Sequence, residues 1–323
     1  MSIRKKEWKF AVLFIFVAAL FVQCTKEESP DKVQGTLEVE ITDAPIDDAE
    51  VSGAFVTVTE IKLDGKTFEG FSGKQTIDLM AYQNGNVKTL GLGEVEVGNY
   101  STITLVLDHA NDENGDSPGC YVATTDGKKH DLSTGSAASQ EIILSNTALS
   151  ISENSTSTLL IDFDLRKTIT QDDSGNDSDY SFVTTAELEA GLRQVEKEQA
   201  GTIEGQCDNS ALHAEKVIVY AYQKGTYNKE QEINGQGSSQ VQFKNAISST
   251  SVQADGSYSL HFLEEGEYEV VFVGYKDAGN DGRFEVAGAL NVDITGSLNL
   301  NEVSVGAQST TTLNVLATGI LPF

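Results

Sequence analysis

The sequence predicts an all-β protein, organised as two tandem antiparallel β-sandwich domains with Greek-key connections. Short segments of alternating apolar and polar residues recur at regular spacing along the chain, and such alternation is typical of half-buried strands. Dipeptides that favour tight turns separate these segments. The 323 residues include only four Pro and show little helical periodicity, which favours sandwiches over a mixed fold.

The first domain is expected to begin at Gly35, where residues 36–42 alternate until Asp43-Ala44-Pro45 ends the strand. Further strands are predicted at Ala54 to Leu63, Gln75 to Met80, Ser101 to Asp108, Tyr121 to Thr125, Glu141 to Leu144 and Thr158 to Phe163. The turns between them are Asp64-Gly65, Asn84-Gly85, Asn114-Gly115 and Asp126-Gly127. Thr185 to Glu198 fits a helix by its Ala, Leu and Glu content, or a strand that closes the domain.

The second domain is expected to open at Gly201. Lys216 to Tyr222 alternates, with Val217, Val219 and Ala221 on one face. The other predicted strands are Val252 to Phe262, which turns at Asp255-Gly256, then Tyr268 to Tyr275 and Thr310 to Leu316.

A Gly-x-Tyr step occurs in both predicted domains, at Gly98-Asn99-Tyr100 and at Gly266-Glu267-Tyr268. Each follows an acidic turn and precedes an alternating strand. Gly can adopt the turn conformation at the entry to the strand, and we expect the Tyr to pack at the rim with its hydroxyl at water. The match indicates a shared architecture.

Two stretches carry resemblances to known families. Residues 35 to about 196, which open with Gly35 to Pro45, resemble the domain-of-unknown-function 4382 family of Bacteroidetes lipoproteins. Residues 201–275 resemble the carboxypeptidase-regulatory-like, transthyretin (prealbumin) type of sandwich, through residues 201–205, Asp255 to Tyr258 and Gly266 to Tyr268. The resemblances imply sandwich folds, no established activity for the first family, and a structural or binding module for the second.

The N-terminus is predicted to be a lipoprotein signal peptide over residues 1–23. Basic residues lead into an uninterrupted apolar run from Phe10 to Val22, which is too short to span a bilayer. Cys24 follows directly and resembles the lipidated thiol of a bacterial lipobox, and Lys26-Glu27-Glu28 resembles a surface-export signal of Bacteroidetes lipoproteins. The alternative is an ordinary secreted protein in which Cys24 is incidental. Residues 24–34 then form a lipidated tether, followed by domains at 35–197 and 198–323.

The charge of the chain disfavours nucleic acid as a partner. Of 22 basic and 49 acidic side chains, the signal peptide removes four and one, which leaves 18 against 48, or a net charge of −30. Binding to phosphates needs Lys and Arg, so this surface instead indicates solubility. The only Trp, Trp8, leaves with the signal, which removes the best stacking platform for sugars.

No catalytic centre is recognisable in the sequence, and we expect a protein that is not an enzyme. The chain has no nucleophile elbow, phosphate-binding loop or Cys-x-x-Cys pair. The four His are scattered and are expected to be structural or exposed: His109, His130, His213 and His261. Cys120 and Cys207 are either buried free thiols or, in an oxidising compartment, a disulfide.

No cofactor is expected, apart from calcium at one acidic loop. Asp277, Asn280, Asp281 and Glu285 place oxygen donors around a turn glycine, as calcium loops do. The spacing is not that of an EF-hand, and residues 108–116 and 172–179 are acidic in a similar way. The alternative for all three is a solvated loop whose Asp, Asn and Gly make turns.

These observations predict a lipid-anchored protein of the outer membrane, exposed at the cell surface, with a structural or ligand-binding role. Its partner is expected to be a polysaccharide or an envelope protein. The alternative is a fimbrial-type assembly subunit that polymerises by strand addition, with residues 309–316 as the donated strand.

Overall fold

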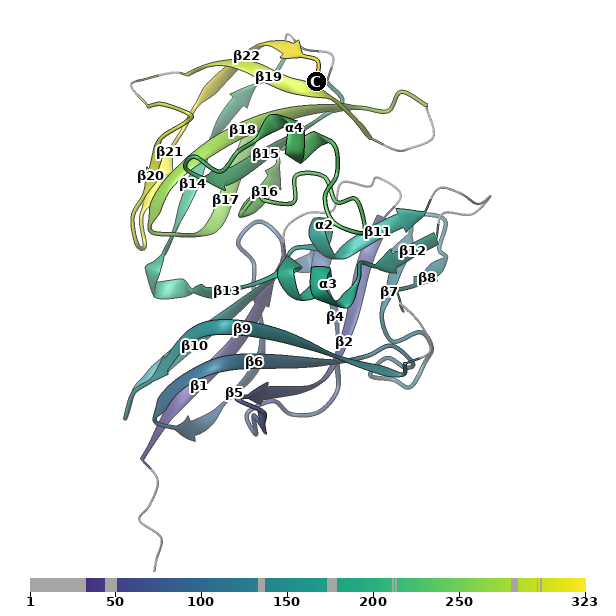
Figure 1. Cartoon of the computed structure of the whole chain (residues 1–323), viewed down its shortest axis with the longest axis vertical. Helices are drawn as coiled ribbons and strands as arrows, with labels where there is room; N and C mark the ends of the chain where they lie inside the picture. The colour runs from purple at the N-terminus through teal and green to yellow at the C-terminus, as the bar shows by residue number, and fades with distance from the viewer. Residues whose placement is uncertain are drawn as a thin grey trace, which may run out of the picture. The chain divides into compact units, whose positions relative to one another are not determined.

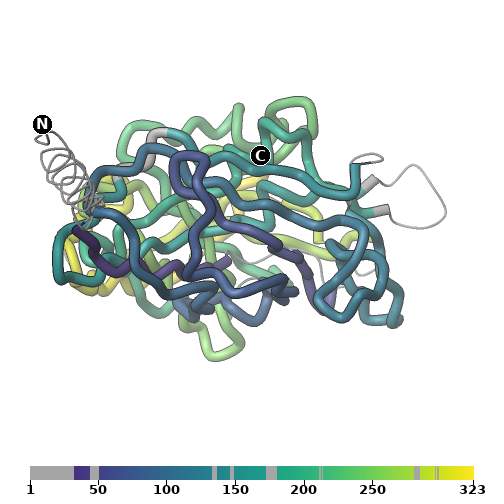
Figure 2. Tube along the Cα trace, turned by 90° about the horizontal axis from the view of Figure 1, so that it is seen from below, coloured from purple at the N-terminus to yellow at the C-terminus, as the bar shows by residue number. Residues whose placement is uncertain are grey.

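Strands make up most of the structure, and the helices between them are short (Figure 1). The computed structural model describes residues 33–43, 51–132, 137–172, 179–210, 212, 214–279, 284–294, 296 and 298–323, and residues 34–323 form one compact unit. The Cα trace in Figure 2 shows the same extended segments from below. The predicted all-β sandwich class is confirmed. Within the described residues, no helix has the length and apolar character needed to cross a membrane.

The strands up to residue 196 form three sheets. A four-stranded sheet has the order β13 (Leu192–Glu196), β10 (Thr156–Phe163), β1 (Gln34–Thr42) and β5 (Lys88–Glu96). A seven-stranded sheet runs β8 (Lys129–Asp131), β7 (Tyr121–Thr124), β2 (Val51–Leu63), β6 (Gly98–Asp108) and β9 (Ser139–Ile151), and β2 also pairs with β3 (Lys66–Thr67) and β4 (Gln75–Asp78). β11 (Ile169–Asp172) pairs with β12 (Asp179–Phe182), and the helices are η1 (Leu79–Tyr82), α2 (Leu165–Thr168) and α3 (Thr185–Gly191). Within this group the pairing is antiparallel, except that β1 runs parallel to β10.

The strands from residue 200 onward form one nine-stranded sheet. Its main path is β16 (Ser248–Ser251), β15 (Lys216–Gln223), β18 (Gly266–Lys276), β19 (Glu285–Ile294), β22 (Val315–Leu321), β14 (Ala200–Asp208) and β17 (Ser257–Glu264). β20 (Val303–Val305) pairs with β18, and β21 (Thr310–Thr312) pairs with β14; the helices are η2 (Lys197–Gln199) and α4 (Lys229–Ile233). No described strand pairs across η2, where the predicted domain boundary falls, and the division into two domains stays a prediction.

Alternation along the strands places the core. In β1, Leu37, Val39 and Ile41 are fully buried, as the period-two pattern requires. In β15 the structure differs from the prediction, because the second face is buried as well as the face of Val217. Tyr220 on that second face stacks on Phe243, with ring centroids 4.5 Å apart. The segment that follows α4 therefore covers the face that the pattern leaves open.

The ambiguous segment after residue 184 contains both predicted elements, a helix and then a strand. Thr184 and Glu187 form a capping box at the start of α3, and β13 then closes the four-stranded sheet against β10. The C-terminal residues 309–316 lie in and around β21 and β22. β22 pairs with β19 on one side and β14 on the other, so this segment is already held within its own sheet.

The two Gly-x-Tyr steps form the same corner in both groups of strands. Tyr100 donates its hydroxyl hydrogen to the carbonyl oxygen of Glu96 at 2.8 Å, and Tyr268 donates to the carbonyl oxygen of Glu264, also at 2.8 Å. The hydroxyl therefore bonds to the backbone four residues upstream, in place of the water that we expected. Because both hydroxyls make the same bond, the two steps are equivalent in structure, as the sequence predicted.

Candidate binding cleft

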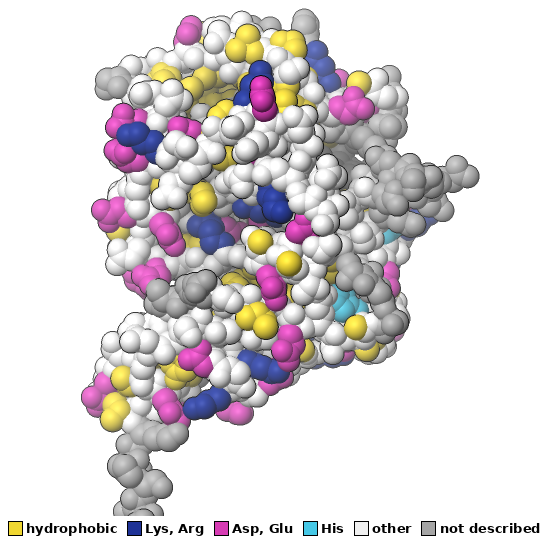
Figure 3. Space-filling view, in the orientation of Figure 1, with side chains coloured by type: hydrophobic (Ala, Val, Ile, Leu, Met, Phe, Trp, Pro, Cys, Tyr) yellow, Lys and Arg dark blue, Asp and Glu magenta, His cyan; other side chains and the backbone are white. Residues whose placement is uncertain are grey.

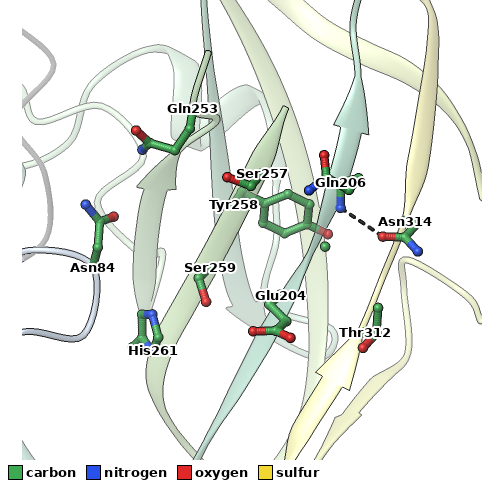
Figure 4. Close-up of a pocket in the computed structure, with 11 residues that line it drawn as sticks. Asn84, Glu204, Gln206, Gln253, Ser257, Tyr258, Ser259, His261, Thr312 and Asn314 are labelled. Carbon is green, nitrogen blue, oxygen red and sulfur yellow. Dashed lines mark hydrogen bonds between the residues drawn. The ribbon is translucent and has the colours of Figure 1, made fainter. Parts of the chain in front are cut away.

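An open cleft of about 560 Å³ lies over the outward face of β14, β17 and β21 (Figure 4). Its lining consists mainly of amide and hydroxyl side chains: Asn84, Gln206, Gln253, Asn314, Ser257, Ser259 and Thr312, together with Glu204, Gly205, Tyr258 and His261. The volume lies within the range of small-ligand sites, which is roughly 300–1,000 Å³.

Strand alternation and register bring these side chains together. Glu204 on β14 stands opposite Ser259 on β17 and Thr312 on β21, while its neighbour Ile203 is fully buried. In the next outward row, Gln206 stands opposite Ser257, and the backbone N–H of Gln206 donates to Asn314 Oδ1 at 2.8 Å. The floor of the cleft is thus made of rows of polar side chains on paired strands.

A β-bulge in β17 shapes one end of the cleft. The register between β14 and β17 shifts at Thr202, so that both His261 and Phe262 stand opposite this one residue. Phe262 has a φ of 57°, which is unusual for a bulky residue, and its carbonyl oxygen accepts a 2.8 Å hydrogen bond from Arg193 Nη1. The bulge lets His261 face the cleft while Phe262 packs against the cluster of Leu160, Val195 and Ala200.

His261 is an uncharged member of the cleft at neutral pH. Burial lowers the pKa of His261 from its usual value, although the nearby Glu204 carboxylate acts in the opposite direction. Its Nδ1 lies 3.4 Å from Thr202 Oγ1. The backbone of Gly85 lies against the ring, since a Cβ added there would sit 2.9 Å from the imidazole. The turn at Asn84-Gly85, predicted from the sequence, therefore closes this end of the cleft.

A small recess continues from the cleft into the protein. It shares Asn84, Ser259 and His261 with the cleft, and its volume of about 20 Å³ leaves room for one water-sized group. Ser249 lies in the wall of this recess; its hydroxyl is buried and has no hydrogen-bond partner among the described residues. Asp162 lies in another wall.

Asp43, in the opening stretch Gly35 to Pro45 that carries the first family resemblance, holds three segments together at the recess. Its Oδ1 accepts from the backbone N–H of Leu165 at 3.0 Å, and its Oδ2 accepts from Gln83 Nε2 at 3.0 Å. Thr42 Oγ1 lies within hydrogen-bond distance of the carbonyls of Tyr82 and Asn86 and shares its one hydrogen between them. Burial raises the pKa of Asp43 well above its usual value, despite the lowering effect of these hydrogen bonds. This part of the opening stretch is structural.

Ion pairs lie around Asp43, and their two Arg side chains also donate to backbone carbonyls beyond residue 197. We call Asp43, Asp162, Asp164, Arg166, Lys167 and Arg193 the junction. Arg193 Nη2 lies 2.6 Å from Asp162 Oδ2. Asp164 Oδ2 lies 2.9 Å from Arg166 Nη2 and 3.4 Å from Lys167 Nζ. Because Arg166 also donates to the Phe243 carbonyl at 2.6 Å, the junction joins both groups of strands.

A second cleft of about 460 Å³ has a different lining. Its aromatic residues are Tyr180, Tyr220, Phe243, Tyr275 and Phe284. The Arg166 guanidinium lies 5.4 Å from the centre of the Tyr220 ring, and the hydroxyls of Tyr220 and Tyr275 are 2.6 Å apart. These polar groups already bond within the protein, so the aromatic cleft is less suited to binding a ligand than the polar one.

The sequence-predicted site residues fall partly outside the described structure. Cys24, Asn280 and Asp281 lie outside the described residues, as does His213. Of the other two, Asp277 donates its backbone N–H to Glu215 Oε2 at 3.1 Å, and Glu285 is the first residue of β19. Among the described residues, no group of three or more His, Cys, Asp or Glu could hold a metal ion. The calcium loop stays a prediction.

The two remaining cysteines are buried free thiols in separate cores. Cys120 packs in the core of the first group of strands and Cys207 in the core of the second. Burial raises the pKa of Cys120 to about 12 and that of Cys207 to about 11. Both thiols are therefore protonated at neutral pH, and a disulfide between them does not form in this structure.

The fold and cleft define a β-sandwich protein whose candidate site is a polar sheet face. Residues 34–183 match the family model described as "Domain of unknown function (DUF4382)", which agrees with the resemblance in the first part of the chain. A search of curated proteins finds no match. The matched range ends before α3 and β13, although β13 completes the four-stranded sheet.

Several of the solved structures with some likeness to this chain are pilin subunits. The Bacillus anthracis TIE protein is 11% identical, with 88% of this chain and 34% of that chain covered and a TM-score of 0.20. BcpA, the major pilin subunit of Bacillus cereus, is 11% identical over 88% of this chain and 71% of its own, with a TM-score of 0.19. The minor pilin of Streptococcus agalactiae is 11% identical, covers 88% and 99%, and also has a TM-score of 0.19. This chain thus spans about a third of the Bacillus anthracis protein.

Proposed function

We propose that this chain is a non-enzymatic lipoprotein of the bacterial cell envelope, attached to the outer membrane through Cys24, exposed at the cell surface, and engaged in ligand binding. The leader sequence supports export and lipidation, since a basic head and an apolar run precede Cys24. Acyl chains contribute about 0.8 kcal/mol per buried methylene to membrane attachment. The carboxypeptidase-regulatory-like resemblance of residues 201–275 is part of this proposal.

The polar cleft is the observation that carries a binding role. Among the described residues that line the cleft, Glu204 is the only carboxylate, whereas glycoside hydrolysis needs two carboxylates flanking the bond. The Tyr258 hydroxyl donates to the Leu313 carbonyl at 2.5 Å, and burial raises its pKa. It is therefore a poor nucleophile. An open site with one carboxylate and many amide and hydroxyl groups suits ligand binding better than glycoside hydrolysis.

The spread of charge agrees with a soluble domain outside the cell. In the space-filling view, acidic side chains are scattered over the visible face and interspersed with Lys and Arg (Figure 3). A net charge of −27 for the whole chain then favours solubility over one concentrated cation site.

Assembly into a fimbria is the second candidate function. A donated C-terminal strand would have to leave its place between β19 and β14, which costs its ladder hydrogen bonds unless a second copy replaces them. A protein that sediments as a monomer at high concentration would remove this candidate.

Metabolic labelling with palmitate tests the envelope assignment. Cells that express the chain should yield a labelled product in the outer-membrane fraction, and Cys24→Ser should abolish the label. Cys207→Ser is the matched control and should keep it, because that thiol is buried. An unlabelled wild-type product, or a label that persists in Cys24→Ser, would overturn the assignment.

A further inference from the structure

We propose that the polar cleft on β14, β17 and β21 binds a neutral polysaccharide chain. This inference rests on the proposed function and names its ligand class and its site. The central contacts are made by Glu204, Gln206 and Thr312, and Asn84 lies at the end that the bulge closes.

Recognition in this cleft depends on side chains. The backbone groups of β14 are used in ladders with β17 on one side and β21 on the other, so an extended peptide cannot add to this face as a new strand. Within the described chain, the side chains of Glu204, Ser259 and Thr312 form no hydrogen bond to the protein, and Figure 4 shows them directed over the strands. They are available to a ligand.

The chemistry of the lining matches hydroxyl groups. Amide side chains such as Gln206 both donate and accept hydrogen bonds, and hydroxyl side chains such as Thr312 do the same. A sugar hydroxyl can donate to the Glu204 carboxylate while it accepts from a neighbouring amide, and a bond to an ionised group is the stronger of the two. A row of adjacent hydroxyls therefore finds complementary partners along the rows of the sheet.

Other ligand classes fit the same lining poorly. A polyanion would meet Glu204 without a Lys or Arg in the cleft. A divalent cation needs several oxygen ligands, usually with more than one carboxylate. A peptide or protein needs apolar anchors, yet the one aromatic side chain of the lining, Tyr258, is only 3% exposed.

The recess beside His261 extends the site. The buried hydroxyl of Ser249 has no partner among the described residues, and the recess has room for one hydroxyl or water. A ligand hydroxyl or a bridging water at the closed end of the cleft gives Ser249 its partner. An unpartnered buried hydroxyl is costly, and binding at this end relieves that cost.

The described lining has no exposed aromatic side chain on which a sugar could stack, and this limits the expected affinity for an oligosaccharide. Without stacking, a short oligosaccharide should bind with a Kd on the order of a millimolar. A long chain on a membrane that carries many copies of the protein binds more tightly through multivalency. Affinity electrophoresis in gels that contain polysaccharide detects binding in this range.

The test uses a soluble form that begins at Thr25, after the predicted lipidated Cys24, and that contains the whole compact unit. Neutral α-glucan, β-glucan, mannan and arabinan are the probes, and polygalacturonate and gelatin are the anionic and peptide comparisons. We expect at least one neutral polysaccharide to retard the wild type, and Glu204→Gln combined with Gln206→Ala to weaken retardation at least tenfold. Glu94→Gln, on the exposed part of β5, is the matched control and should leave retardation unchanged.

Each other outcome counts against the proposal. The proposal is overturned if no neutral probe retards the wild type. It is also overturned if the cleft variant and the wild type are retarded equally, or if polygalacturonate or gelatin is the selective probe. The melting temperature of the cleft variant should equal that of the wild type, which separates lost binding from lost folding. Failure here, together with intact palmitate labelling, would overturn the ligand and site while the envelope assignment stands.

Discussion

The junction and the polar cleft adjoin each other, and each contains at least one acidic side chain, but these side chains have opposite surroundings in the two regions. In the junction, Asp43 bonds to Leu165 and Gln83, and Asp162 pairs with Arg193 at 2.6 Å. In the cleft, Glu204 forms no such pair among the described residues and faces solvent. The two regions meet at Asn84, Ser259 and His261, which line both the cleft and the recess.

The difference shows that residue type alone does not decide the role of a polar side chain. A buried carboxylate without partners is costly, and each Asp of the junction has at least one hydrogen-bond or ion-pair partner. An exposed carboxylate keeps its hydration and can exchange water for a ligand. Changes in the junction should therefore alter stability, and changes in the cleft should alter binding.

Breaking the Asp162–Arg193 pair should give the largest effect. Asp162→Ala leaves the Arg193 guanidinium largely buried without its partner, and loss of one partner of a buried pair costs about 3–5 kcal/mol. Urea denaturation of the mature chain measures this loss in the free energy of unfolding. The matched surface variant is Glu267→Ala, whose pair with Lys224 is 49% exposed on the Glu side and should cost less than about 1 kcal/mol. Equal losses in the two variants would contradict the contrast.

Asp43 should produce a pH-dependent effect. Because its folded pKa is raised, its contribution to stability is complete below the usual Asp pKa and is lost as pH rises through the folded value. Asp43→Asn removes this titration and keeps an oxygen for the N–H of Leu165. From pH 5 to pH 8, the stability of the variant relative to wild type should rise, by on the order of 1 kcal/mol. Parallel urea-denaturation profiles across this range would contradict the assignment.

Gly85 lies at the boundary between the two regions and should give the smallest effect. It has a φ of +82°, and an added Cβ would sit 2.9 Å from the His261 ring. Gly65→Ala is a matched control, because Gly65 has a φ of +77° with nothing within 4 Å of the added atom. Both substitutions place Ala at a positive φ, which costs about 1 kcal/mol of folding stability in each variant. Any additional loss of stability in Gly85→Ala therefore reports the contact with His261. If both variants melt at the same temperature, that contact contributes nothing.

Two of the strands absent from the sequence-based prediction, β5 and β19, show the limits of pattern reading. β5 contains Gly91 and Gly93, which break the alternation. A Cβ on Gly91 would lie 2.7 Å from the Gly70 carbonyl, so the glycines are there because another backbone approaches closely. β19 begins at Glu285, inside the acidic stretch that was interpreted as a calcium loop. The approach of a second backbone to β5 is not visible in the local sequence, and neither is the strand that begins within the acidic stretch.

The sequence alone determined the strand class, the turns and the equivalence of the two Gly-x-Tyr steps, because these depend on neighbours within a few residues. The alternation that sends Ile203 inward and Glu204 outward could be predicted from β14 itself. Only the tertiary structure decided that Glu204 meets Thr312, more than a hundred residues away, and that Asp43 is buried while Glu204 is not. The register between distant strands depends on how whole sheets pack, and so does the burial of a charged side chain. The pattern of residues within one strand specifies neither of them.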